Sequence, residues 1–410
     1  MTDHPAHAAV AVGSSRTVGS ALEVLWVATK LGLTSFGGPI AHLGYFHDEY
    51  VRRRQWLDEP SYADLVALCQ FAPGPTSSKV GFSIGLLRAG YWGGLAAWAG
   101  FTLPSALLLL LFAYGAGALS GPIGTGLLHG LKLVAVAIVA QAVAGMAKNL
   151  CPDRERASIA GVAALIVLLS TSRFSQLAAI LFGAVAGAWL FRHIGAVRAE
   201  HAPIKVSRRV GVAALATFFG LLFGLPLMRA LTGSQAIAMM EAFYRSGALV
   251  FGGGHVVLPL LQGAVVAPGW VGDDAFLAGY GAAQAVPGPL FTFAAYLGAV
   301  MGPSPNGVTG AALGLVSIFL PGLLLHLGTL PFWETFRRRA GTQAVMRGIN
   351  AAVVGLLGAA LYSPIWTSAV QRPQDFAVAL VGFILLAGWK APPVVVVAVS
   401  ALGGAACSLF

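Results

Sequence analysis

The chain has 410 residues, of which 57% are hydrophobic and only 10% are charged, and its mean hydropathy is +0.79. Because soluble domains carry about 25% charged residues, this composition excludes an ordinary soluble domain and indicates a polytopic membrane protein. The net charge of +10 comes from short loops between apolar runs, which is typical of membrane topology and not of a nucleic-acid-binding surface.

Apolar runs of membrane-helix length, or close to it, follow one another along the chain. In order they cover residues 21–45, 62–87, 91–118, 125–147, 157–172, 174–191, 210–232, 236–262, 276–300, 308–330, 343–364, 374–389 and 392–408. A span needs roughly 20 apolar residues, so 157–172 and 374–389 are marginal. We predict an all-α polytopic membrane protein in which nine runs cross fully. The other four, 21–45, 62–87, 236–262 and 276–300, are expected to be broken helices or re-entrant hairpins.

Several motifs recur in the same order in the two halves of the chain. KLGLTSFGGP begins at Lys30 and RSGALVFGGG at Arg245, so that a basic residue, a glycine and Phe-Gly-Gly recur in register. The further matches are QFAPGP with QAVPGP, Trp56 with Trp270, Pro104 with Pro321, and HGLK at His129 with RGIN at Arg347. The pattern predicts an N-terminal tail (1–20), two homologous repeats (21–195 and 236–410), and between them a basic linker with an unpaired helix (196–235).

Equivalent loops of the two repeats carry opposite charge bias. VRRRQW at 51–56 is strongly basic, whereas VAPGWVGDD at 266–274 has no basic residue. Conversely, the loop at 117–126 is uncharged, whereas its counterpart contains three arginines at 337–339. By the positive-inside rule, equivalent loops then lie on opposite sides of the membrane. This predicts an inverted-topology repeat with a cytoplasmic N-terminus, as in many secondary transporters.

With these motifs in hand, the chain resembles the chromate ion transporter family in its long two-domain form. The matching stretches are SFGGPIAHLGYFHDEYVRRRQWL and QFAPGPTSSKVGFSIGLLRAGYWGG in the first half, and FGGGHVVLPLL and QAVPGPLFTFAAYLG in the second. The resemblance implies efflux of chromate across the inner (plasma) membrane, with chromate resistance, and competition or exchange with sulfate. The second half departs from the pattern: FGGG replaces Phe-Gly-Gly-Pro, and Leu290 and Phe291 replace hydroxyl residues.

Each Pro-Gly-Pro motif interrupts an apolar run. Proline removes a backbone donor and clashes with the preceding turn, so one helix ends there and another begins. Free N–H groups and the positive end of the new helix would face the break, where an oxyanion could bind. The expected substrate ligands are Pro73, Gly74, Pro75, Thr76, Ser77, Ser78 and Lys79, with Pro287, Gly288, Pro289 and the preceding Gln70 and Gln284. The alternative is a kink that serves packing only.

The Phe-Gly-Gly motifs follow a similar logic, because glycines let backbones approach closely and expose their amides. The candidate residues are Phe36, Gly37, Gly38 and Pro39 in the first half, and Gly252, Gly253, Gly254 and His255 in the second. Helix packing through small residues is the alternative interpretation, and it is compatible with binding.

Two basic residues lie inside apolar runs, each six residues before its Phe-Gly-Gly motif. Lys30 and Arg245 could each supply one positive charge to a dianion near the membrane midplane. Snorkelling to a nearby interface is the alternative. The acids Glu23, Asp64 and Glu241 are candidates for carrying coupling protons, against the alternative of plain charge pairing.

No other chemistry is indicated. The chain has no nucleotide-binding loop, and its three cysteines have no metal or redox spacing, so we expect no enzyme activity, metal or cofactor. His47, Asp48 and Glu49 are interpreted as a solvated loop because they lead into three arginines. Secondary active oxyanion transport is the leading hypothesis. A potential-driven channel or uniporter, a sulfate transporter and a membrane-embedded reductase remain alternatives, and the oligomeric state is open, a homodimer included.

Overall fold

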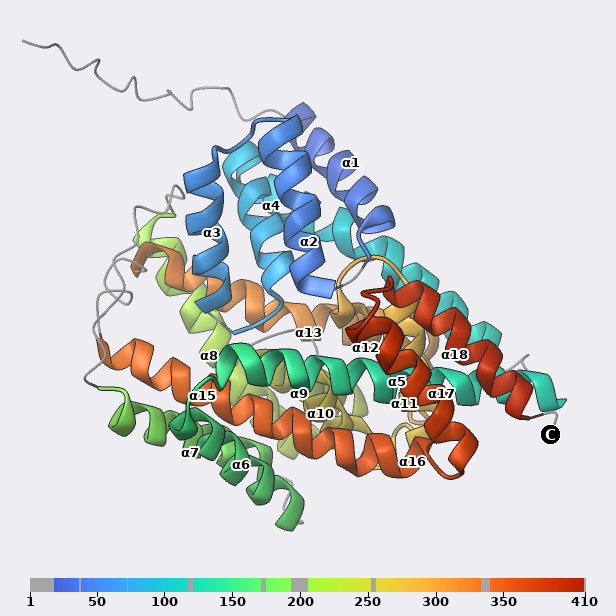
Figure 1. Ribbon diagram of the computed structural model, residues 1–410. Helices are drawn as coiled ribbons and strands as arrows, with labels where there is room; N and C mark the ends of the chain where they lie inside the picture. The colour runs from blue at the N-terminus through green and yellow to red at the C-terminus, as the bar shows by residue number, and fades with distance from the viewer. Residues whose placement is uncertain are drawn as a thin grey trace, which may run out of the picture.

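The computed structural model describes residues 18–36, 38–71, 73–116, 121–170, 175–192, 206–251, 256–332 and 340–408. Within these ranges every regular element is a helix, which confirms the predicted all-α fold (Figure 1). The first-half helices are α1 (Val18–Thr34), α2 (Gly38–Phe46), α3 (Glu59–Phe71), α4 (Thr76–Gly115), α5 (Gly121–Leu150), α6 (Arg154–Leu169) and α7 (Ser175–Leu190). The linker helix is α8 (Arg208–Thr232).

The second half repeats this alternation of short and long helices. Its helices are α9 (Gln235–Ala248), α10 (Val257–Leu261), α11 (Asp273–Ala285), α12 (Phe293–Val300), α13 (Gly307–Thr329), α15 (Ala340–Ala360), α16 (Thr367–Ala369), α17 (Pro373–Ala387) and α18 (Pro393–Cys407). Turns of π-helix cover His47–Arg53, Gln262–Val266 and Leu361–Trp366, and short 3₁₀ turns cover Leu290–Thr292 and Leu330–Phe332.

Five helical segments in the described part of the chain are long and apolar enough to cross a membrane. They are Thr76–Gly115, Gly121–Leu150, Arg208–Thr232, Gly307–Phe332 and Gly341–Ala369. Shorter apolar helices, among them α7, α17 and α18, have 10–17 residues. Large apolar side chains such as Trp92, Leu111 and Phe223 are exposed on these helices, as expected of surfaces that face lipid. These features support a multi-pass membrane protein.

The four runs that we expected to be interrupted each contain two separate helices. The first helix ends at Thr34 in 21–45 and at Phe71 in 62–87, and the next begins at Gly38 and Thr76. In the second half, α9 and α10 are separated by residues 249–256, and α11 and the turn before α12 by residues 286–289. Among the described residues, the chain is thus non-helical from 73 to 75 and from 286 to 289, at the two Pro-Gly-Pro motifs.

The 40-residue helix α4 is two helices joined at a kink. Ala89 and Gly90 have non-helical backbone angles, and Gly90 has a positive φ of 67°. At 1.5 Å per residue, a straight helix of this length would be about 60 Å long, twice the hydrocarbon thickness of a bilayer. The kink separates a first arm that begins at Thr76 from the apolar run 91–118.

The two halves interlock. In each half, the helix before Phe-Gly-Gly packs on the long helix after Pro-Gly-Pro: α1 on α4, and α9 on α13. Helices α6 and α7 of the first half lie along α15 of the second, and α5 lies against α17 and α18 (Figure 1). Helix α4 of the first half also packs against α11 and α12, the two helices that flank the second Pro-Gly-Pro motif.

Candidate functional site

Two main-chain hydrogen bonds join the interruptions of one half to those of the other. The N–H of Gly74 donates to the carbonyl oxygen of Val250 at 2.7 Å, and the N–H of Gly288 donates to that of Ser35 at 2.9 Å. Each glycine is the centre of a Pro-Gly-Pro motif, and each acceptor directly precedes a Phe-Gly-Gly motif. We call these contacts the Gly74–Val250 crossing and the Gly288–Ser35 crossing.

Both crossings require glycine. Gly74 has φ +104° and Gly288 has φ +95°, which L side chains rarely adopt. A Cβ on Gly74 would lie 2.8 Å from the Cα of Gly322, and a Cβ on Gly288 would lie 2.8 Å from the Oγ of Ser105. Gly322 and Ser105 directly follow the two prolines that the repeat pairs, so each glycine meets the corresponding position of the opposite half.

Buried polar side chains surround the Gly288–Ser35 crossing. His42 packs edge-on against the ring of Phe101 at 5.2 Å, and its Nδ1 is hydrogen-bonded to the Ser77 hydroxyl at 3.3 Å. The carbonyl oxygen of Phe101 lies 3.1 Å from the Cβ position of Gly288. Ser105 donates to the carbonyl of Thr102, the residue after Phe101, at 3.1 Å. These contacts link α2, the start and the middle of α4, and the second-half break.

Three buried polar atoms at this crossing have no hydrogen-bond partner among the described residues: Ser35 Oγ, His42 Nε2 and Thr102 Oγ1. Their residues are at most 1% exposed. The amide nitrogen of Gln284, four residues before Gly288, and the hydroxyl of Ser78 are unpartnered within the same set of residues. Because buried polar atoms are nearly always hydrogen-bonded, this concentration indicates a place for a polar ligand.

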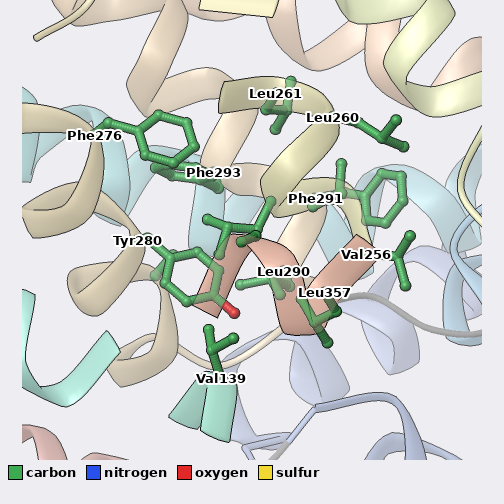
Figure 2. Close-up of a cluster of buried hydrophobic side chains, with 14 of the residues drawn as sticks. Val139, Val256, Leu260, Leu261, Phe276, Tyr280, Leu290, Phe291, Phe293 and Leu357 are labelled. Carbon is green, nitrogen blue, oxygen red and sulfur yellow. The ribbon is translucent and has the colours of Figure 1, made fainter. Parts of the chain in front are cut away.

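At the Gly74–Val250 crossing, the positions that correspond to these polar residues are apolar. Counted from the repeated motifs, Val250, Val257 and Phe319 take the positions of Ser35, His42 and Thr102, and Phe291 takes that of Ser77. All four are buried, and the rings of Phe291 and Phe319 lie 5.5 Å apart. Figure 2 shows Phe291 and its neighbours Leu290 and Phe293 inside a large hydrophobic core to which both halves contribute, Val139 of α5 included.

The arm that begins at Thr76 carries buried polar groups next to the first break. Ser77 and Ser78 are 2% exposed and Lys79 is 0% exposed. Lys79 Nζ donates to the carbonyl oxygen of Pro73 at 3.2 Å, so the ammonium lies beside the break. Its charge also interacts with His326 of α13, whose Nε2 is hydrogen-bonded to the Ser83 hydroxyl at 2.6 Å.

Lys30 takes part in an ion-pair network and is 42% exposed. Its Nζ donates to Glu49 at 3.0 Å, and the same carboxylate accepts from Arg53 at 3.2 Å and from Arg54 at 2.8 Å. Burial opposes ionisation of Glu49, but the bonds from Arg54 and Lys30 dominate and lower its pKa from 4.5 to about 2. The expectation of a solvated loop was wrong for Glu49, which is buried.

The acids Glu23 and Glu241 are also paired with basic side chains. Glu23 accepts from Arg54 at 3.3 Å and from Arg88 at 3.1 Å. In the second half, Glu241 is buried and accepts from Arg245 at 2.8 Å and from Arg229 at 2.9 Å. Glu23 and Glu241 thus adopt the charge pairing that the sequence offered as the alternative to proton coupling.

Other predicted residues are less well placed or cannot be placed. Gln70 is exposed at the end of α3, and Phe36, Pro39 and Gln284 are partly buried. Gly37, Gly252, Gly253, Gly254 and His255 lie outside the described residues, as does the side chain of Asp64. Within the described part of the chain, no group of three or more His, Cys, Asp or Glu side chains could hold a metal ion.

Comparison with known proteins decides the family. The sequence model of a family described as chromate transporter matches residues 22–188 and again residues 237–405. The chain belongs to the chromate transporter family. The two matched regions fall within the two predicted repeats, and they show that this transporter has the long two-domain form.

Named relatives of this transporter match along most of its length. A chromate transport protein of Pseudomonas aeruginosa is 27% identical, over 93% of this chain and 90% of the relative. A probable chromate transport protein of Synechococcus elongatus is 27% identical over 92% of both chains. A chromate transport protein of Cupriavidus metallidurans is 26% identical over 91% and 90%. No solved structure matches the transporter at a significant level.

Sequence reasoning missed Ser35, Thr102 and Glu49. Ser35 directly follows α1, and Thr102 lies in an apolar stretch of α4. Only the folded backbone brings Ser35 and Phe101, the residue before Thr102, to Gly288. One signal could have found Ser35, because it lies beside the repeated Phe-Gly-Gly where the other half has valine.

Proposed function

We propose that this chain is a secondary transporter that carries chromate out of the cytoplasm and holds the dianion where the interruptions of its two halves meet. The observation that carries the proposal is the pair of reciprocal hydrogen bonds, Gly74 to Val250 and Gly288 to Ser35. Broken backbone at membrane depth is tolerated only inside protein or beside water, and paired breaks in repeat transporters form the substrate site. The relatives named as chromate transport proteins indicate the substrate.

The arrangement of each half supports an inverted repeat. Gly32 of α1 packs against the carbonyl of Gly100 in α4, and Gly247 of α9 packs against that of Ile318 in α13. These glycines occupy equivalent positions two residues after Lys30 and Arg245. Together with the opposite charge of equivalent loops, this equivalence favours two similar units of opposite orientation in a plasma membrane.

The first arm supplies most of the positive character of the proposed site. Helix α4 begins directly after Pro75, so its first N–H groups and the positive end of its dipole face the break. Lys79 adds a fully buried ammonium group there. Lys30 and Arg245 complete the predicted ligand set. To bind the substrate, Lys30 would release Glu49 and Arg245 would release Glu241.

The driving force favours export. With an inside-negative membrane potential, moving a dianion outward is downhill by about 2.3 kcal/mol per charge for each 100 mV. Sulfate has the same charge and tetrahedral shape, so we expect it to compete with chromate. Rocking of the two halves about the crossings would expose the site alternately to each side.

The test is uptake of radiolabelled chromate into inside-out membrane vesicles under imposed pH and potential gradients. We expect wild-type vesicles to accumulate chromate when the vesicle interior is positive, and external sulfate to inhibit this uptake. Lys79→Met should reduce uptake at least tenfold, whereas Lys148→Met, at an exposed lysine at the end of α5, should not. Equal uptake by vesicles that lack the protein would refute the function. Acceleration by trans sulfate or protons would indicate exchange, and its absence a uniporter.

A further inference from the structure

We propose that the transported oxyanion is coordinated directly by the uncharged donors Ser35, His42 and Thr102 at the Gly288–Ser35 crossing, and that each chain binds one oxyanion. This inference rests on the proposed transport of a tetrahedral dianion. It adds ligand contacts from residues outside the Pro-Gly-Pro arm and places them at only one of the two crossings.

Several buried side-chain atoms at this crossing have no hydrogen-bond partner among the described residues. Ser35 Oγ, His42 Nε2 and Thr102 Oγ1 are unpartnered among the described residues, and their residues are 0%, 1% and 0% exposed. Elsewhere in the core, buried hydroxyls such as those of Ser246 and Thr292 hydrogen-bond to carbonyl oxygens of their own helix or turn. Unpartnered buried side-chain atoms also occur elsewhere among the described residues, Ser400 Oγ and His326 Nδ1 among them, but at this crossing three are grouped around one main-chain hydrogen bond.

The three donor residues lie near one another in the fold. The Ser35 carbonyl accepts the N–H of Gly288, and the Cβ position of Gly288 lies 3.1 Å from the Phe101 carbonyl, next to Thr102. His42 stacks edge-on against the same Phe101. Gly288 and Phe101 thus connect all three donor residues, which come from the end of α1, from α2 and from the middle of α4.

Two hydroxyls and an imidazole can each donate a hydrogen bond. Serine and threonine hydroxyls rotate freely and can each donate one hydrogen bond. The hydrogen bond between Ser77 and His42 Nδ1 fixes the imidazole plane, and when Nδ1 accepts, the neutral ring carries its proton on Nε2. An oxyanion without protons only accepts hydrogen bonds, so three neighbouring residues that can each donate one hydrogen bond match it. A cation would find no carboxylate in this set.

The Gly74–Val250 crossing lacks these three donors. The corresponding positions are Val250, Val257 and Phe319, which have no side-chain donor. Phe319 is in ring contact with Phe291 and with Trp98, so the space is filled by aromatic carbon. The repeat therefore supplies one donor set and one apolar counterpart, which predicts a single oxyanion per chain despite two homologous halves.

The experiment is equilibrium binding of radiolabelled chromate, and separately of sulfate, to the purified full-length protein in detergent. We expect one bound oxyanion per chain. Ser35→Ala, Thr102→Val and His42→Phe should each raise the dissociation constant about tenfold or more, as expected for loss of a hydrogen bond to a charged group. His42→Gln keeps a side-chain N–H donor and should recover part of the affinity. Ser246→Ala removes a buried hydroxyl that already has partners and should bind like wild type.

Folding is checked for every variant by size-exclusion profile and thermal unfolding, and only monodisperse variants with near-native unfolding are compared. Wild-type affinity in Ser35→Ala and Thr102→Val, or two oxyanions per chain, would overturn this inference and leave the proposed transport function intact. Failure of the wild-type protein to bind or transport either oxyanion would instead overturn the function itself. A larger effect of His42→Gln than of His42→Phe would exclude His42 as a donor.

Discussion

The N–H of Gly74 donates a 2.7 Å hydrogen bond to the carbonyl oxygen of Val250, which lies 176 residues further along the chain. Gly288 and Ser35 form the corresponding bond with the halves exchanged. Because both bonds join main-chain atoms at helix interruptions, they tie the two halves together at the place where each half is least regular.

Substitution of these glycines should damage the fold unequally. Gly74→Ala forces a side chain into φ +104° and onto the Cα of Gly322, which cannot move without shifting α13. We expect a loss of about 2 kcal/mol or more in stability from the backbone strain alone. Gly288→Ala has a similar φ but meets the Ser105 hydroxyl, which can rotate, so its effect should be smaller. Thermal unfolding in detergent gives the order.

The control for both is Gly145→Ala. Gly145 lies inside α5 with no atom within 4 Å of its Cβ position, so alanine should be tolerated there or slightly stabilising. An unfolding temperature of Gly74→Ala equal to that of Gly145→Ala would show that the crossing does not hold the halves together.

Glu49 should contribute stability that depends on pH. Its pKa is lowered to about 2 in the folded chain, below its ordinary value of 4.5, so the stabilisation is complete above about pH 4.5 and is lost as the pH falls toward 2. Glu49→Gln should reduce the free energy of unfolding by about 2 kcal/mol at neutral pH, because hydrogen bonds from charged Lys30, Arg53 and Arg54 are weakened.

The measurement is thermal unfolding of wild type and Glu49→Gln between pH 3 and pH 7. The two unfolding temperatures should approach each other on the acid side, because Glu49 of the unfolded chain becomes protonated below about pH 4.5 whereas Glu49 of the folded chain stays ionised until about pH 2. A constant difference across this range would show that Glu49 acts through packing and not through charge. Asp48→Asn removes an exposed carboxylate in the same turn and should change little.

Glu241 should behave as a structural anion. Its buried carboxylate accepts from Arg229 of α8 and Arg245 of α9, so Glu241→Gln should weaken the packing of the linker helix on the second half. We expect lower thermal stability and an unchanged pH dependence of chromate uptake in inside-out vesicles. A shifted pH dependence of chromate uptake would indicate instead that Glu241 carries a coupling proton.

The inverted orientation of the halves can be tested by labelling. Arg52 is 70% exposed in its side chain and Asp273 is exposed at the start of α11, at loops that the repeat places as equivalents. Cysteines introduced at these two positions, in a background without the native cysteines, should react with a membrane-impermeant maleimide from opposite sides. Reaction from the same side in sealed vesicles of one orientation would contradict an inverted repeat.

Local backbone chemistry made much of the fold predictable. Two prolines around a glycine at Pro73–Pro75 and at Pro287–Pro289 strongly disfavour a continuous helix, although single prolines such as Pro104 and Pro321 lie inside helices. Helix α4 begins at Thr76, directly after the first of these motifs, and α11 ends at Ala285, just before the second. The boundary between the apolar runs 62–87 and 91–118 likewise coincides with the kink at Ala89 and Gly90. Each of these features depends on residues close together in the chain.

The candidate site was less predictable because its contacts join distant segments. Hydropathy alone gives no reason for Glu49 to be buried in a turn that also contains Arg52 and Arg53, and the π-helical geometry there turns it inward. In the sequence, Thr102 is one hydroxyl within an apolar helix, and only the fold brings Gly288 against the preceding residue, Phe101. Such proximity depends on how α4 packs against the opposite half, which no local pattern encodes.

The crossings also explain how two related halves can take on different tasks. A joint made of N–H and C=O groups is indifferent to the side chain that its acceptor residue carries, as serine at one crossing and valine at the other show. Symmetry of the scaffold is thereby uncoupled from symmetry of the chemistry. One copy of the repeat can evolve a surface rich in hydrogen-bond donors while the other becomes apolar. Neither change alters the main-chain hydrogen bonds that join the two halves.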